Sequence, residues 1–250
     1  MIQLKTEEQI NAMKLACRIT GEALALAGEH IKPGVTTKYI NDIVRNHIEK
    51  CGARPSFLGY GGFPGSACIS INDEVIHGIP SKKRVIGDGD IVKVDVGAFY
   101  HGYHGDSANT FACGNISEEA KRLIEATKES FYQGVAKAVI GNRLGDIGSA
   151  VEEYNKSCGF SVVREFVGHG IGRDLHEDPN VPNYGTPGRG VRLLKGITLA
   201  IEPMVCQKDS KVKVLSDEWT VVTCDGGLSA HYEHTVAITE EGPILLTKIN

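Results

Sequence analysis

The sequence has little of what marks several large classes of protein. Aromatic residues make up only 6% of its 250 residues, and there is a single tryptophan. No apolar run approaches the roughly 20 residues that a membrane-spanning helix needs. Lysine and arginine (27) do not outnumber aspartate and glutamate (31), so the formal net charge is −4. Because proteins that grip nucleic acid usually carry a basic excess, we expect neither nucleic acid nor a membrane as a partner.

Cysteine pairs at the spacing of zinc or redox motifs are also missing. There are seven cysteines, an odd number, and no two of them form a C-x-x-C motif. Scattered thiols that do not pair by number are typical of a reducing compartment. The charged, amphipathic N-terminus differs from a signal peptide. We therefore expect a cytoplasmic protein.

The residue present in excess is glycine. It accounts for 30 of 250 residues, or 12%, against an average of about 7%. There is no collagen period, and the 41% hydrophobic and 23% charged residues are ordinary globular usage. Many positions are therefore expected to need unusual backbone angles or close backbone approach, within a chain that has enough apolar material for a full core.

Helical periodicity predicts two pairs of helices. Thr6 and Gln9 form a capping-box pattern before the first helix, and a second helix covers about 37–50. Later, Ser117 opens a helical stretch that carries apolar residues as far as Val139, and another helix covers about 144–156. Each pair leads to a Cys-Gly step, and the two steps are 107 residues apart. This order suggests an internal duplication, although amphipathic helix pairs also resemble one another by chance.

Strand patterns follow each helix pair. Alternating β-branched and polar residues predict strands at 67–71, 90–96, 109–113, 161–167, 197–201, 212–215, 219–224 and 235–239. The fold class is therefore α+β, with a sheet covered by helices. No linker-like composition separates the halves, so we expect one domain over 1–250, with halves near 1–115 and 116–250. A sheet shared by the halves would put an active site between them.

Four acids and one histidine lie in or beside these predicted strands. They are Asp95, Asp106, His169, Glu202 and Glu233. Each acid alone could be an ordinary residue of a turn or an edge strand, without a function. Four carboxylates brought together would repel strongly without cations. Their charge of −4 would be neutralised by two divalent ions, which favours a two-metal hydrolytic centre.

The glycine-rich stretch at 168–173 (GHGIGR) allows other interpretations. Its glycine spacing is similar to a nucleotide-binding loop, which requires a strand before it and a helix after it. The following residues, DLHEDP, are a poor start for such a helix. Small residues on both sides of His169 leave room around an imidazole. The alternative to both interpretations is a glycine-rich turn in which the histidine has no function.

Together these residues resemble the methionine aminopeptidases, most closely their short type I bacterial form. The resemblance covers essentially the whole chain and is carried by 70–80 (SINDEVIHGIP), 104–106 (HGD), 168–173 (GHGIGR), 201–204 (IEPM) and 233–235 (EHT). It implies the pita-bread fold, in which two pseudo-symmetric α/β halves share a curved, mostly antiparallel sheet covered by helices. It also implies removal of the initiator methionine from new polypeptides whose second residue is small.

The resemblance implies a role for each metal ligand. Asp95 chelates one ion with both oxygens, Asp106 and Glu233 bridge two ions, and His169 and Glu202 complete the second. The ions are Co, Mn, Fe or Zn, and a site of this composition does not say which. A water or hydroxide between them attacks the scissile carbonyl.

The catalytic residues that the resemblance implies are Glu202, His77 and His176. Glu202 shuttles the proton, and the two histidines hydrogen-bond the substrate amide and stabilise the tetrahedral intermediate. His104 precedes Gly105 and Asp106, and we expect it either to orient Asp106 or to face solvent.

The same resemblance implies a small apolar pocket for the methionine side chain. Its lining is Phe57, Tyr60, Phe63, Cys68, Leu175 and Trp219, together with His77 and His176. The family commonly has cysteine, tyrosine and phenylalanine where Phe57, Phe63 and Leu175 stand, so the lining stays apolar but its shape is in doubt. Asn72 and Ser229 match positions that hold a monovalent cation, Na or K, in some relatives.

The expected partner is a peptide with an N-terminal methionine, met transiently as a nascent chain at the ribosome, and the enzyme is expected to be a monomer. Two rivals share the fold. A pita-bread peptidase that requires proline would have all five ligands, and the His-Gly-Ile-Pro context argues against it. An RNA- or histone-binding relative would lack ligands and gain basic surface, and neither applies here.

Overall fold

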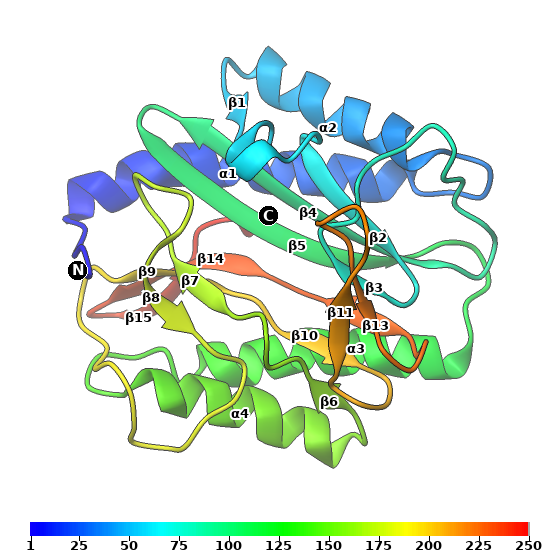
Figure 1. Cartoon of the computed structure of the whole chain (residues 1–250). Coiled ribbons are helices and arrows are strands. Elements are labelled where there is room, and N and C mark those ends of the chain that lie inside the picture. Colours follow the sequence, from blue (N-terminus) through cyan, green and yellow to red (C-terminus); the bar gives the residue numbers. More distant parts are fainter. Residues whose placement is uncertain (250) are drawn as a thin grey trace.

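The structure is a computed structural model that describes residues 1–249. Its helices are α1 (Glu7–His30), α2 (Thr37–Lys50), α3 (Glu118–Val135) and α4 (Leu144–Ser157), with a short 3₁₀ turn, η1 (Tyr60–Gly62). The pair α1 and α2 lies on one side of the strands and the pair α3 and α4 on the other (Figure 1). Among the described residues, no helix combines the length and the apolar character needed to cross a membrane.

The helices begin where the sequence predicts. Thr6 Oγ1 accepts a hydrogen bond from the backbone N–H of Gln9 at 3.2 Å, and Gln9 Oε1 accepts from the N–H of Thr6 at 2.9 Å. This reciprocal pair satisfies two backbone donors that a helix start would otherwise leave free. Ser117 caps α3 with a single hydrogen bond, in which its hydroxyl oxygen accepts from the N–H of Ala120.

The end of α3 differs from the prediction, because Val139 lies beyond it. The helix stops at Val135, and the chain turns so that Gly141 and Asn142 pair with the backbone of Leu193. Gly141 N–H donates to Leu193 O at 3.1 Å, and Leu193 N–H donates to Asn142 O at 2.8 Å. Tertiary backbone pairing therefore takes precedence over the helical periodicity.

The strands pair antiparallel throughout the described part of the chain. One sheet contains β1 (Arg54–Pro55), β4 (Ile91–Tyr100), β2 (Ala67–Ile71) and β5 (Tyr103–Ala112). Another has the order β15 (Gly242–Leu245), β14 (His234–Thr239), β9 (Thr198–Ile201), β7 (Gly168–Gly170) and β8 (Glu177–Val181). Two smaller sheets have the orders β13 (Ser229–His231), β10 (Met204–Cys206), β6 (Ser161–Val162) and β11 (Val212–Val214), β12 (Val221–Thr223), β3 (Glu74–Ile76). The α+β class is confirmed.

A pair of backbone hydrogen bonds joins the two large sheets. Glu233 N–H donates to Ala108 O at 2.9 Å, and Ala108 N–H donates to Glu233 O at 3.3 Å. Close by, Thr235 Oγ1 accepts from Asp106 N–H at 3.0 Å and donates to Asp106 O at 2.9 Å. The strands of the two halves therefore meet at the acids themselves.

Two strands have other bounds than the sequence predicts. The stretch 161–167 contains only a two-residue strand, β6, whereas β5 begins at Tyr103 rather than near 109. A glycine inside a strand normally weakens it, but Gly105 is needed here. A Cβ on Gly105 would lie 2.6 Å from Cys17 Cα of α1. The helix rests directly on the strand backbone, which is why this stretch resembles a loop in the sequence and is a strand in the fold.

Candidate metal centre

Two adjacent strands place the first two acids. Asp95 lies in the middle of β4, and Asp106 lies near the start of β5. In their antiparallel register Asp106 faces Gly97, two residues beyond Asp95. Residues two apart on one strand share a face, so the two carboxylates lie diagonally opposite each other on the same side of the sheet. The charge of Asp95 helps to raise the pKa of Asp106.

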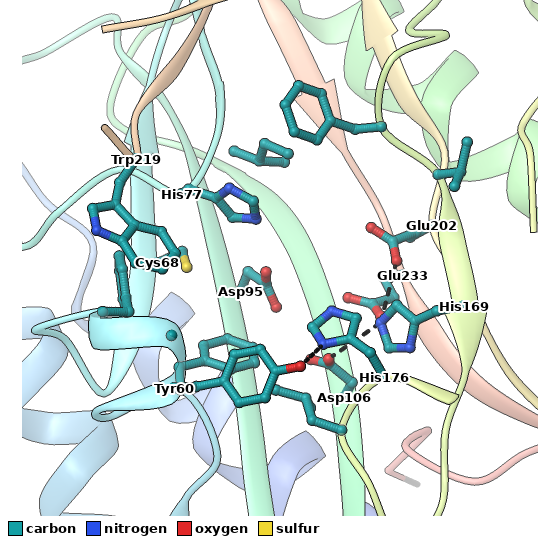
Figure 2. Close-up of a pocket in the computed structure, with 17 residues that line it drawn as sticks. Tyr60, Cys68, His77, Asp95, Asp106, His169, His176, Glu202, Trp219 and Glu233 are labelled. Atoms are coloured by element: carbon teal, nitrogen blue, oxygen red, sulfur yellow. Dashed lines mark hydrogen bonds and ion pairs between the residues drawn. The ribbon is translucent and has the colours of Figure 1, made fainter. Parts of the chain in front are cut away.

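The other three ligands come from the second half. His169 is the middle residue of β7, Glu202 follows the last residue of β9, and Glu233 lies between β13 and β14. The register pairs His169 with Ala200 and His234 with Ile201, which brings the three side chains to one edge. Sequence positions more than 60 residues from Asp95 and Asp106 therefore converge on the same point (Figure 2).

The donor atoms are spaced for a shared cation. His169 Nε2 lies 3.8 Å from Asp106 Oδ2 and 3.6 Å from Glu202 Oε1. One donor atom each from Asp106, His169 and Glu233 lies within 4.8 Å of the other two. All three side chains are buried, so bulk water does not compensate their charge.

The electrostatics of the cluster are those of a site that needs counter-ions. Burial raises the pKa of Asp95 to about 7 and that of Glu202 to about 8. Burial and the neighbouring carboxylates raise the pKa of Asp106 and Glu233 well above the usual range. Buried oxygens of Asp95, Asp106 and Glu233 have no hydrogen-bond partner. Buried acceptors without donors are costly, and these hard oxygens with one imidazole fit divalent ions.

The orientation of His169 leaves one ring nitrogen for a metal. Its Nδ1 lies 2.8 Å from the carbonyl oxygen of Gly170. A carbonyl only accepts, so Nδ1 carries the hydrogen and Nε2 presents its lone pair to the carboxylates. Burial lowers the pKa of His169 to about 3, which keeps the ring neutral.

Glycine is required on both sides of His169 because the neighbouring strands pack closely there. A Cβ on Gly168 would lie 2.3 Å from the carbonyl oxygen of Ala200, and one on Gly170 would lie 2.2 Å from that of Asp178. Gly168–Gly170 is the strand β7 between β8 and β9, and no helix follows it. The nucleotide-loop interpretation of this stretch is therefore wrong, and the glycine-rich turn is a strand.

A cavity of about 250 Å³ opens onto the ligands. It is lined by all thirteen residues that the sequence predicts for the metal site, the substrate pocket and catalysis: Phe57, Tyr60, Phe63, Cys68, His77, Asp95, Asp106, His169, Leu175, His176, Glu202, Trp219 and Glu233. Glu202, Glu233, His169 and Asp106 lie toward one end, Cys68 and Trp219 stand at the other, and Asp95 lies between them (Figure 2). In the β2–β4 register Cys68 faces Asp95 directly, so the apolar wall abuts the metal site.

Two histidines border the space between these ends. His77 has a left-handed backbone (φ +59°) and packs edge-on against Phe166 and Trp219. His176 shares a 2.8 Å hydrogen bond between Nδ1 and the hydroxyl of Tyr60, and its ring lies 4.1 Å from that of His169. Burial lowers the pKa of both histidines, that of His77 to about 4. Both rings are therefore neutral near pH 7.

Known proteins share this arrangement. Residues 11–240 match the family model described as metallopeptidase family M24. The chain belongs to this family. A methionine aminopeptidase of Clostridium acetobutylicum is 58% identical over 247 residues, 99% of each chain, and methionine aminopeptidase 1 of Bacillus subtilis is 51% identical over 249 residues, all of both chains. Within family M24 this chain thus groups with the methionine aminopeptidases, and the predicted enzyme class is confirmed.

Solved structures of family M24 agree on the fold. A methionine aminopeptidase of Thermotoga maritima matches with a TM-score of 0.98 and 47% identity over all of both chains. A prolidase of Pyrococcus furiosus matches 99% of this chain with a TM-score of 0.79 and 26% identity, but this chain covers only 66% of the prolidase. The predicted pita-bread fold is confirmed.

Two secondary predictions for this M24 chain do not fit the structure. Asn72 and Ser229 do lie together, but their carbonyl oxygens accept hydrogen bonds from Lys93 Nζ at 2.7 and 3.0 Å. A buried ammonium group therefore stands where we expected Na or K. His104 does not orient Asp106: its Nδ1 shares a 2.9 Å hydrogen bond with Ser56 Oγ.

Sequence reasoning missed several residues of the site. Ile76, Phe166 and Val167 also line the cavity, and their apolar types gave no signal. His231 is buried below the ligands, with Nε2 3.6 Å from Glu202 Oε2 and without a hydrogen-bond partner. Its position two residues before Glu233 was a usable signal, since alternate strand residues share a face.

Proposed function

We propose that this M24 chain is a dimetal methionine aminopeptidase that removes the initiator methionine from polypeptides whose second residue is small. One observation carries the proposal. The five candidate ligands and an apolar recess line a single cavity, and Asp95 lies between the recess and the other four ligands. A methionine side chain in the recess would present the first peptide bond of its chain to the metal end.

Asp95, Asp106, His169, Glu202 and Glu233 would hold two divalent ions. The unpartnered buried oxygens and the raised carboxylate pKa values support this assignment. Bound there, such ions supply a water of lowered pKa and polarise the scissile carbonyl. The donor set accepts Co, Mn, Fe or Zn, and cellular availability decides among them more than affinity does.

The chain's own residues handle the proton and the peptide group. We assign proton transfer to Glu202, which reaches the cavity and lies between His169 Nε2 and His231 Nε2, 3.6 Å from each. Neutral His77 and His176 each have one N–H to donate. Placed on two sides of the cavity, they would bind the substrate amide and stabilise charge on the tetrahedral carbon's oxygen.

The recess suits a flexible thioether. Phe63 and Trp219 meet edge to face with ring centroids 5.1 Å apart, and sulfur packs favourably at aromatic rings. Burial raises the pKa of the Cys68 thiol well above its usual value. Cys68 therefore acts as a small apolar wall rather than a nucleophile.

We further propose that the enzyme works as a cytoplasmic monomer on nascent chains leaving the ribosome. All seven cysteines are unpaired, which agrees with a reducing compartment. The net charge of −4 argues against stable binding to nucleic acid. The same charge makes the contact with a ribosome transient.

The deciding experiment compares two peptides. The protein is stripped of metal, reloaded with Mn²⁺ or Co²⁺, and given Met-Gly-Met or an Xaa-Pro peptide without methionine. We expect release of methionine from the first and no cleavage of the second. Activity on the Xaa-Pro peptide alone would transfer the protein to the proline-requiring peptidases. The variants Asp106→Ala and Glu233→Ala should be inactive, and activity that survives both would contradict the metal mechanism.

A further inference from the structure

Lys93 is the largest fully buried side chain in the described part of the molecule, with a relative exposure of 1%. It lies on β4, and its Nζ donates to the carbonyl oxygens of Asn72 and Ser229 at 2.7 and 3.0 Å. A lysine is almost never fully buried unless a partner holds its head group. Here the partners are two backbone carbonyls from opposite halves of the chain.

The Asn72 carbonyl has no capacity left for a metal cation. Besides Lys93 Nζ it receives the N–H of Ser229 at 3.0 Å, while the single hydroxyl hydrogen of Ser229 has the carbonyl of Glu74 within reach at 3.1 Å. A carbonyl oxygen has two lone pairs, so these two donors saturate it. A Na or K ion at this point would have to displace the ammonium group and meet its charge.

The contacts of the Lys93 amino group do not depend on its charge. Burial disfavours the charged form and lowers the pKa of Lys93 to about 7, and Glu74 and Asp73 only partly offset this effect. In either protonation state the amino group has two N–H donors for the two carbonyls.

We propose that Lys93 is a built-in substitute for the monovalent cation, so that this enzyme needs neither Na nor K. Backbone carbonyls are the groups that replace the hydration shell of such an ion in proteins. An ammonium group is a compact point charge of +1, the same charge that Na⁺ or K⁺ carries. The cation is here part of the chain and cannot dissociate.

Its position makes Lys93 a positioning residue for the metal centre. Lys93 and Asp95 are two apart on β4 and share a face. Ser229 begins β13, which leads to Glu233, and the Asn72 side chain is fixed by Asp90 and by the N–H of Ile91. The Lys93 amino group thereby ties the turn after β2 to the strand that leads to a ligand of the other half.

The first test compares salts at one ionic strength. Thermal unfolding and methionine release are measured in choline chloride, NaCl and KCl. We expect the unaltered enzyme to differ less than twofold in activity among the three, with one melting temperature. Lys93→Asn leaves space and two free carbonyls, so it should be destabilised in choline chloride and be restored by NaCl or KCl. Lys93→Met fills the space without a donor, so it should be destabilised and not restored.

Two controls separate this idea from general salt effects and from poor folding. Lys83→Asn, which changes an exposed lysine, should show no selective response to Na or K. Crystals of the unaltered protein soaked in RbCl should show no anomalous peak between the Asn72 and Ser229 carbonyls, even if the Lys93 variants do not fold. A Rb⁺ peak there, or more than fivefold activation of the unaltered enzyme by KCl over choline chloride, would overturn the proposal. The proposal concerns the proposed peptidase, but melting temperature and Rb⁺ occupancy test it without any assay of activity.

Discussion

Filling the metal centre at pH 7 should expel protons from the protein. Divalent ions bind ionised carboxylates, yet burial raises the pKa of Glu202 to about 8 and keeps Asp106 and Glu233 protonated well above their usual range. His169 contributes nothing, because its pKa is lowered to about 3 and its ring is already neutral. Among the protein's own ligands, the protons released at pH 7 therefore come from carboxyl groups alone.

The size and sign of the effect follow from these values. With a pKa of about 8, Glu202 is about nine-tenths protonated at pH 7, so it supplies close to one proton by itself. Each proton released makes metal affinity rise about tenfold per pH unit, or about 1.36 kcal/mol. The raised pKa values weaken binding at low pH, so affinity should increase from pH 6.5 to 8 and level off once the ligands are ionised.

Calorimetry measures this directly. Metal-free protein is titrated with Mn²⁺ at pH 7 in two buffers of different ionisation enthalpy, and the difference in heat gives the protons released per molecule. We expect at least about one. Glu202→Gln should lower the number by about one, whereas Glu153→Gln, an exposed acid on α4, should leave it unchanged. Zero proton release, or an affinity that is flat between pH 6.5 and 8, would refute the electrostatic account of the site.

Further predictions concern stability and turnover. Gly168→Ala would push a Cβ to within 2.3 Å of a strand carbonyl oxygen. Urea unfolding should show that the free energy of unfolding falls by about 1–3 kcal/mol. Gly87→Ala, whose Cβ would have its nearest atom at 3.4 Å, should lower the free energy of unfolding much less. Tyr60→Phe removes the hydroxyl that holds His176, and kcat/KM should fall by about fivefold, the value of one hydrogen bond, with an unchanged melting temperature because Tyr60 is 46% exposed. His231→Ala leaves Glu202 without its buried neighbour. That variant should lose kcat more than KM, and His231→Gln should recover part of it, whereas equal recovery by His231→Leu would indicate packing alone.

Local rules account for what the sequence revealed of the fold. The capping box at Thr6 and the cap at Ser117 are short-range patterns, and both appear in the structure. The errors in the predicted bounds arise from tertiary contacts. The pairing of Gly141 and Asn142 with Leu193 ends α3 early, and contact between α1 and Gly105 turns an apparent loop into β5. Neither contact is visible from residues near each other in the chain.

The candidate site could be predicted because its chemistry is concentrated in a few residue types in or beside strands. Carboxylates and a histidine in apolar strands are costly to bury, so their presence at five positions required an explanation. Ile76, Phe166 and Val167 carry no such cost and stayed hidden, although they line the same cavity. Lys93 does have such a cost of burial, because a lysine in the middle of the apolar run IVKVDV needs a buried partner. The partners are backbone carbonyls, which no sequence pattern displays.

The glycine excess also reflects contacts between segments that are far apart in the sequence. Gly105, Gly168 and Gly170 all have ordinary negative-φ backbones, so their conformations would admit alanine. What excludes a side chain is an atom of another segment less than 3 Å from the missing Cβ: α1 at Gly105, and strand carbonyls at Gly168 and Gly170. These approaches bring Asp106 and His169, the residues next to those glycines, to the depth at which their donor atoms lie 3.8 Å apart. Of the two explanations that the glycine excess predicts, unusual backbone angles and close backbone approach, the second is therefore the one that applies at these positions.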